Sequence, residues 1–164
     1  MAHTDFLPAM GHAPLWLYDP VTKLMRISRA HRRLLVHAQL EPGMRVLDIG
    51  CGTGNLALLA RRTGAQITAL DPDDRVLARA RAKATRMGLD IRFEEGYGEQ
   101  LPHPDGSFDR VISAFAFHHV RDRAAMLSEA TRVGGALFLA DFAFVDVPGL
   151  TRLERRGAVA YFRT

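Results

Sequence analysis

The segment that most constrains the fold of this chain is Val46-Leu47-Asp48-Ile49-Gly50-Cys51-Gly52-Thr53-Gly54. A short apolar run typical of a buried strand leads into three glycines at alternate positions, and a helical stretch follows. Glycine tolerates positive φ and lets a ligand approach the backbone closely. The helix offers unpaired N–H groups and the positive end of its dipole to an anion. The segment therefore predicts a strand, a ligand-binding glycine loop and a helix.

The glycine spacing separates two classes of ligand. A dinucleotide-binding loop reads G-x-G-x-x-G, whereas the third glycine of this chain comes one residue earlier. Asp48 lies at the end of the strand, where its carboxylate would repel a pyrophosphate and would suit a ligand that carries a cation. A nicotinamide-dependent oxidoreductase is one function that this fold class allows, and both features argue against it.

Strands and helices alternate along most of the chain. Strands are expected at 45–49, 66–70, 91–93, 110–115 and 136–142, and helices at 21–40, 55–62, 73–87, 122–133 and 150–161. This order predicts an α/β fold: a Rossmann-like, doubly wound parallel sheet in three layers. Because only about 22 residues follow the fifth strand, we expect a C-terminally shortened sheet of about five strands.

Asp71 is the second signal for a binding site. It ends the second strand, 21 residues after Gly50, and Pro72 follows and fixes the turn. In a Rossmann unit a carboxylate at this position accepts hydrogen bonds from the ribose hydroxyls. Taken alone, Asp71 could also cap the next helix, but next to the glycine loop the ribose role is favoured.

Three segments together resemble a known family. VLDIGCGTG, ALDPDD and EGYGEQLPHPDGSFDRVISAF, in this order and spacing, resemble the class I S-adenosylmethionine-dependent methyltransferases. The resemblance is closest to the branch with the ubiquinone/menaquinone-biosynthesis C-methyltransferases and covers about residues 40–145. It implies transfer of the methyl group of S-adenosylmethionine to a small organic acceptor. The alternative is an S-adenosylmethionine-binding module with weak or no turnover.

The resemblance also implies a role for individual residues. Residues along the methionine part of the cofactor would be Asp48, Gly50, Gly52 and Thr53, with Gly54 supporting the loop. Asp71 would hold the ribose, and Pro72 would set the turn beside it. Tyr97 and Gly98 would flank the adenine, and Ser113 would contact the methionine carboxylate.

The chain departs from this family in three places. Tyr97 stands where the family usually has an aspartate that accepts from the adenine amino group. The turn Arg132-Val133-Gly134-Gly135 is about three residues shorter than usual. The family sheet carries two further strands, whereas we expect Leu150–Tyr161 to form one helix. The fifth strand would then have an open edge, through which two copies could associate as a homodimer.

Three residues are candidates for the catalytic base. His118 and His119 follow the fourth strand, at the edge where such sheets bind ligands. Tyr18 lies in the N-terminal arm and could belong to a substrate lid. A base helps when the acceptor is a phenol, a carbon acid or a protonated amine. The alternatives are packing or solvation of the histidines and packing of the arm. Adjacent histidines in a regular strand or helix cannot both point at one ion, so we expect no metal.

The remaining properties limit the organisation and the partners. We divide the chain into an N-terminal arm and helix (1–40) on the substrate side and a cofactor-binding domain (41–164). The net charge of +4 comes from dispersed arginines without interleaved aromatics, so we expect a small-molecule substrate and no nucleic acid. We expect no membrane span and no signal peptide. With Cys51 as the single cysteine, these features favour the cytoplasm.

Overall fold

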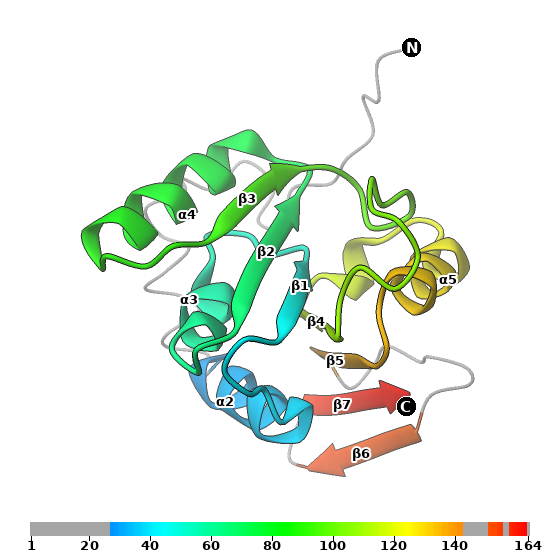
Figure 1. Ribbon diagram of the computed structural model, residues 1–164. Helices are drawn as coiled ribbons and strands as arrows, with labels where there is room; N and C mark the ends of the chain where they lie inside the picture. The colour runs from blue at the N-terminus through cyan, green and yellow to red at the C-terminus, as the bar shows by residue number, and fades with distance from the viewer. Residues whose placement is uncertain (1–26, 143–150, 156–157, 164) are drawn as a thin grey trace.

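The computed structural model describes residues 27–142, 151–155 and 158–163 of the chain, and Figure 1 shows a sheet with helices on both faces. The strands are β1 (Arg45–Ile49), β2 (Gln66–Asp71), β3 (Arg92–Glu95), β4 (Arg110–Ala114), β5 (Leu137–Phe142), β6 (Thr151–Arg155) and β7 (Ala158–Arg163). The helices are α2 (Ile27–Ala38), α3 (Asn55–Arg61), α4 (Asp74–Arg86) and α5 (Arg123–Val133), with a short 3-10 helix η1 (Phe117–His119).

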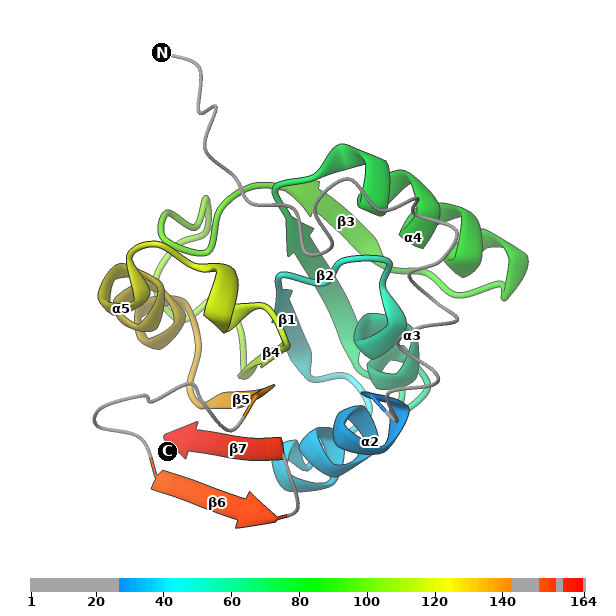
Figure 2. The ribbon, with the colours of Figure 1, turned by 180° about the vertical axis from the view of Figure 1, so that it is seen from behind.

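The five strands expected from the sequence form the parallel part of the sheet. The full order is β3-β2-β1-β4-β5-β7-β6, and the first five strands in it run parallel to their neighbours. Helices α2, α3 and α4 lie on one side of the sheet and α5 lies on the other (Figures 1 and 2). The Rossmann-like, three-layered α/β fold is therefore confirmed.

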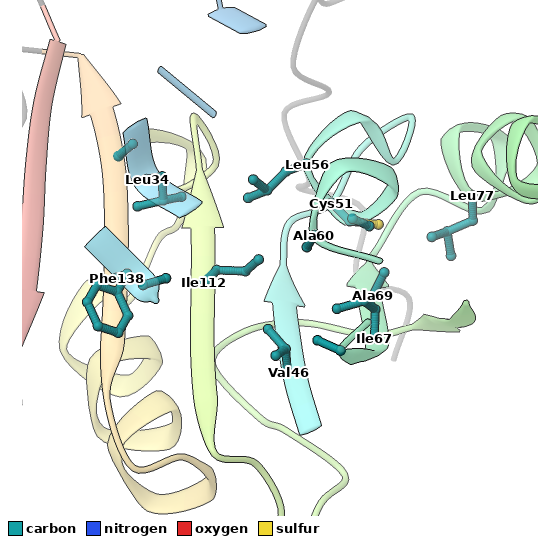
Figure 3. Close-up of a cluster of buried hydrophobic side chains, with 14 residues drawn as sticks. Leu34, Val46, Cys51, Leu56, Ala60, Ile67, Ala69, Leu77, Ile112 and Phe138 are labelled. Carbon is teal, nitrogen blue, oxygen red and sulfur yellow. The ribbon is translucent and has the colours of Figure 1, made fainter. Parts of the chain in front are cut away.

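Residue alternation along β1 supplies both faces of this sheet. Val46 belongs to the core cluster beneath α2, α3 and α4, whereas Leu47 and Ile49 belong to the cluster beneath α5. Figure 3 shows the first of these clusters, where Leu34 of α2 packs beside the strands. A parallel sheet that is covered on both faces needs such continuous burial, and β1 is buried from its second residue onward.

The C-terminal segment differs from the sequence prediction. We expected one helix at Leu150–Tyr161, but the structure has the antiparallel pair β6 and β7 there. Strand β7 also pairs antiparallel with β5, with Phe138 opposite Phe162, so the edge of β5 is occupied. The expectation of an open edge at β5 is wrong, and the homodimer through that edge loses its basis.

The shortened turn between α5 and β5 is accommodated by two glycines. Helix α5 ends at Val133, and the chain enters β5 through Gly134 and Gly135. A Cβ atom on Gly134 would lie 2.3 Å from Cγ2 of Val111, so only glycine fits this approach to β4. The turn is therefore short because the helix end packs directly on the sheet.

Helix α2 is packed into the core rather than set apart from it. Leu34 is 1% exposed and Ala38 is fully buried, and α2 contacts β4, β5 and α3. Residues 1–26 lie outside the described residues, so the division into 1–40 and 41–164 stays a prediction. Within the described ranges, no helix is long and apolar enough to cross a membrane.

Candidate cofactor site

The glycine loop after β1 has the conformation that its sequence predicts. Gly50, Gly52 and Gly54 all have positive φ, at 71°, 53° and 79°. A Cβ atom on Gly50 would lie 2.3 Å from Cβ of Ala116, so a side chain there would collide with the loop after β4. The N–H groups of Gly50 and Cys51 both donate to the carbonyl of Leu70, at 2.8 and 3.0 Å. These bonds hold the loop against the end of β2.

Two cavities open on either side of this loop. The larger, about 630 Å³ including its open side, is lined by Ile49, Gly50, Gly52, Leu70, Asp71, Pro72, Tyr97, Gly98, Glu99, Phe115, Ala116, His119, Val120 and Met126. The smaller, about 380 Å³ on the same measure, is lined by Ile27, His31, Asp48, Gly50, Cys51, Thr53, Asn55, Leu56, Ala114 and Phe115. Gly50 and Phe115 line both, so the two cavities are adjacent.

Asp71 lies in the larger cavity and also supports the loop. Its carboxylate accepts the N–H of Gly52 at 2.8 Å through Oδ2 and the N–H of Asp73 at 3.0 Å through Oδ1. Burial raises the pKa of Asp71, and these two backbone bonds lower it in part. A carboxylate has about four acceptor positions, so Asp71 keeps capacity for ligand hydroxyls. Pro72 lines the cavity beside it.

Asp48 is the most unusual group in the smaller cavity. Its side chain is 1% exposed, and neither carboxylate oxygen has a hydrogen-bond partner. Burial raises the pKa of Asp48 to about 8, and the charge of Asp71 adds to this. The backbone N–H of Ala57 approaches the carboxyl group but falls short of a hydrogen bond, so it lowers the pKa only in part. A buried carboxyl group without a partner is costly, so this one calls for a ligand that carries a cation or a donor.

Thr53 and Gly54 connect the loop to α4. Thr53 is 1% exposed, and its hydroxyl oxygen accepts from Nζ of Lys83 at 3.0 Å. The same ammonium group donates to Oδ1 of Asn55 at 2.8 Å. A Cβ atom on Gly54 would lie 2.9 Å from Cβ of Ala80, so this glycine is required where α3 starts beside α4. Gly54 therefore lets the start of α3 pack closely against α4.

Tyr97 and Gly98 lie in the loop after β3 and both line the larger cavity. Tyr97 is 38% exposed, and Glu99 lines the same cavity two residues further on. A Cβ atom on Gly98 would lie 2.8 Å from Cγ2 of Ile49 and 3.2 Å from Cγ of Met126. The glycine thus lets the loop pack closely over the end of β1.

Ser113 is placed differently from the other predicted residues. It is fully buried, and its hydroxyl donates to the carbonyl of Ile49 at 2.8 Å. It is absent from the linings of both cavities. Its observed contact joins β4 to the last residue of β1, just before the glycine loop.

The two candidate histidines lie on η1 and have different surroundings. His118 is held by Asp141 of β5: its Nδ1 is 2.7 Å from Oδ1, and its backbone N–H donates to Oδ2 at 3.0 Å. His119 lines the larger cavity, and its ring lies 3.9 Å from that of His118, centre to centre. Burial lowers the pKa of His119, and the neighbouring His118 adds to the effect. Tyr18 lies outside the described residues.

His31 and Phe115 are two residues of the smaller cavity that sequence reasoning missed. His31 of α2 is 7% exposed, and burial lowers its pKa to about 4. Phe115, the residue after β4, has a φ of 57°, a conformation that is rare for a bulky side chain. Their rings lie 6.0 Å apart, centre to centre. One signal for His31 was available, because it shares a helical face with Leu34 and Ala38.

Comparison with known proteins decides the family. The model of a family described as "Methyltransferase domain" matches residues 47–139, more than half of the chain. The chain belongs to this family. In the part of the chain that the structure describes, no three His, Cys, Asp or Glu side chains gather in a way that could hold a metal ion.

Named relatives agree with this assignment. The chain is 39% identical over 149 residues to the ubiquinone/menaquinone biosynthesis C-methyltransferase UbiE of Methylobacterium nodulans, with 83% of this chain and 59% of the relative covered. It is 38% identical over 133 residues to demethylmenaquinone methyltransferase of Thermus thermophilus, with 76% and 60% covered. The chain spans between about a third and three fifths of the length of the curated relatives it matches.

A solved structure agrees at the level of the fold. The crystal structure of a SAM-dependent methyltransferase from Aquifex aeolicus matches with a TM-score of 0.71 at 20% identity. The match covers 88% of this chain and 96% of that one.

The residues present fit S-adenosylmethionine, the cofactor that the family implies. The apolar larger cavity with Asp71 at one side has room and chemistry for an adenosine part, and the smaller cavity with Asp48 has a group that suits an amino-acid part. The buried, unpartnered carboxyl group of Asp48 is the observation that decides this fit, because the α-ammonium group is the donor it lacks.

Proposed function

We propose that this chain binds S-adenosylmethionine across the two cavities and transfers its methyl group to a small organic acceptor. The observation that carries the proposal is the pair of buried carboxyl groups on either side of the glycine loop. Asp71 faces the larger cavity and Asp48 the smaller one. Asp71 accepts the ribose hydroxyls, and Asp48 accepts from the α-ammonium group. Tyr97 and Gly98 border the adenine.

The chemistry needs positioning more than acid–base assistance. When bound, the cofactor supplies a methyl group that is already activated, because its leaving group is a neutral thioether. The chain must hold the acceptor in line with the methyl group and exclude water. Phe115 lines both cavities and borders the point where they meet, so we assign it to the wall against which the acceptor packs.

His119 is the group that we assign to proton removal from the acceptor. Its lowered pKa keeps its ring neutral near pH 7, which a base requires. His118 and Asp141 form a hydrogen-bonded pair behind it and position η1. The two relatives described above are named for ubiquinone, menaquinone and demethylmenaquinone, so we propose an aromatic acceptor of the quinol type. The single, buried Cys51 supports a reducing compartment, the cytoplasm.

Turnover tests this proposal. The chain is incubated with S-adenosylmethionine and a demethylmenaquinol or simple hydroquinone, and S-adenosylhomocysteine and the methylated product are quantified by mass spectrometry. We expect equal amounts of both products, and His119→Gln should lower kcat about a hundredfold with little change in the KM for the cofactor. Tight cofactor binding without any methylated product would instead favour the binding module.

A further inference from the structure

His31 is a buried histidine that the proposed reaction leaves without a role. It projects from α2 into the smaller cavity, which it shares with Asp48, Thr53 and Asn55. The burial of Leu34 and Ala38 on the same helix face fixes its position. Its ring is tilted by 52° against that of Phe115, and both rings line the cavity.

An amino-acid ligand brings two charges into this cavity. Its ammonium group satisfies Asp48, and its carboxylate then needs a positive donor of its own, because burying a second anion near Asp48 is costly. Among the described residues that line the cavity, only His31 has a side chain that can become a cation. Lys83 is not among the lining residues, and its ammonium group donates to the side chains of Thr53 and Asn55.

We propose that His31 binds the carboxylate of the methionine part of the cofactor and is protonated in the complex. This inference rests on the proposed function, because it concerns the same ligand. Asp48 and His31 then form a matched pair that recognises the amino acid at both of its charges. Without ligand, Asp48 and His31 are both uncharged. In the complex, Asp48 is a carboxylate and His31 is an imidazolium cation.

The proton balance follows from the state of the two groups before binding. At pH 7 burial keeps His31 neutral, with a pKa of about 4, and keeps Asp48 protonated, with a pKa of about 8. On binding, Asp48 gives up its proton to face the ammonium group, and His31 takes up one proton to face the carboxylate. The net exchange with solvent is therefore close to zero.

Other ionisable groups around α2 do not alter this balance. Burial raises the pKa of the Cys51 thiol well above its usual range, so it stays neutral. Arg110 of β4 donates to the carbonyl of Ala38, at the opposite end of α2. Asp141 of β5 pairs with His118. On α3, Asn55 is uncharged, and Arg61 near its far end donates to the carbonyl of Asp90.

Calorimetry in two buffers of different ionisation heat measures these protons directly. The probe is S-adenosylhomocysteine at pH 7, which keeps the amino-acid end. We expect the wild-type chain to exchange close to no protons. His31→Gln should release about one proton per ligand bound and bind about tenfold to a hundredfold more weakly. Asp48→Asn should take up about one. A His31→Gln variant that matches the wild type in affinity and proton count overturns the proposal.

A truncated ligand separates carboxylate binding from a structural role. 5′-Methylthioadenosine lacks the amino-acid end, so His31→Gln and the wild type should bind it equally. An equal loss for both ligands would mean that His31 only holds the cavity in shape, and would overturn the proposal. His37→Gln, an exposed position on the same helix, is the matched control and should behave as wild type. If the wild type itself fails to bind S-adenosylhomocysteine, the proposed function fails first.

Discussion

The carboxylate of Asp71 both holds the glycine loop and lines the larger cavity, so its substitution tests the proposed site directly. It accepts backbone N–H groups from Gly52 and Asp73 while it faces the larger cavity. Asp71→Asn keeps one acceptor oxygen but loses the charge. We expect cofactor affinity to fall at least about tenfold, because hydrogen bonds to charged groups contribute about 1.5–3 kcal/mol.

The control for Asp71 lies two residues away. Asp73 caps α4 by accepting from the N–H of Arg75, and asparagine caps a helix about as well. Asp73→Asn should therefore leave affinity for S-adenosylhomocysteine unchanged in calorimetry. Equal affinity of the Asp71 variant and the wild type would remove the ribose role.

Gly52 is constrained by its backbone angle and by its hydrogen bond to Asp71. With φ at 53°, a branched side chain is strained by about 1–2 kcal/mol and stands where the ligand approaches the loop. We expect Gly52→Val to abolish cofactor binding in calorimetry. Gly88→Val is the matched control, because Gly88 has a φ of 61° with open space around it. It should lose similar stability and still bind; full binding by the Gly52 variant would contradict this account of the loop.

The two buried groups of the smaller cavity predict an unusual pH dependence of stability without cofactor. His31 has a lowered pKa, so the unfolded chain holds more protons there between about pH 4 and 6.5, and stability rises with pH. Asp48 has a raised pKa, so the folded chain holds more protons between about pH 4 and 8, and stability falls with pH. Each slope is about 1.4 kcal/mol per pH unit, so they oppose each other up to pH 6.5.

Single variants should reveal each slope. In thermal unfolding at a series of pH values, the stability of Asp48→Asn relative to the wild type should rise from about pH 4 to 8, because the falling slope is removed. The stability of His31→Gln relative to the wild type should fall from about pH 4 to 6.5 and then stay level to pH 8, because the rising slope is removed. Other groups contribute equally to all three proteins, so curves that run parallel to the wild type would contradict the assigned protonation states.

At the scale of elements, the β5–β7–β6 region shows what local sequence could not reveal. The stretch 150–161 contains Leu, Glu and Arg, which are good helix formers, and the spacing of its apolar residues is compatible with a helix. Pairing with the edge of β5 overrides this local preference, because strand formation depends on partners far away in the chain. By contrast, β1, α3, β2 and α4 carry glycines and caps at their ends and were predicted closely.

Removing this strand pair tests its role at the edge of β5. A chain that ends at residue 142 exposes the N–H and C=O groups that β7 now occupies. We expect a lower unfolding temperature and self-association, measured by light scattering over a wide concentration range. A chain that ends at Arg163, which lacks only Thr164, is the control. If the shorter chain stays monomeric and equally stable, β5 does not need its antiparallel neighbour.

At the scale of the whole molecule, the site lies where a doubly wound sheet changes direction. Strands β1 and β4 are neighbours, yet the chain runs from β1 outward to β3 before it returns. This reversal opens the crevice at the carboxyl ends of the strands. This crevice is lined by the glycine loop, Asp71, Tyr97 and His119. The packing of α2 on the sheet places His31 in the adjacent smaller cavity. His31 and Asp48 line the same cavity through tertiary packing, which residue spacing in the sequence does not encode.

The most direct measurement is a calorimetric titration of the chain with S-adenosylmethionine and, separately, with NADH. The two ligands share an adenosine, but only S-adenosylmethionine carries an ammonium group that can pair with Asp48, whereas NADH carries a pyrophosphate and leaves Asp48 without a cationic partner. We expect saturable binding of one S-adenosylmethionine per chain and no measurable binding of NADH. Tight binding of NADH, or no binding of S-adenosylmethionine by the folded chain, would contradict this expectation.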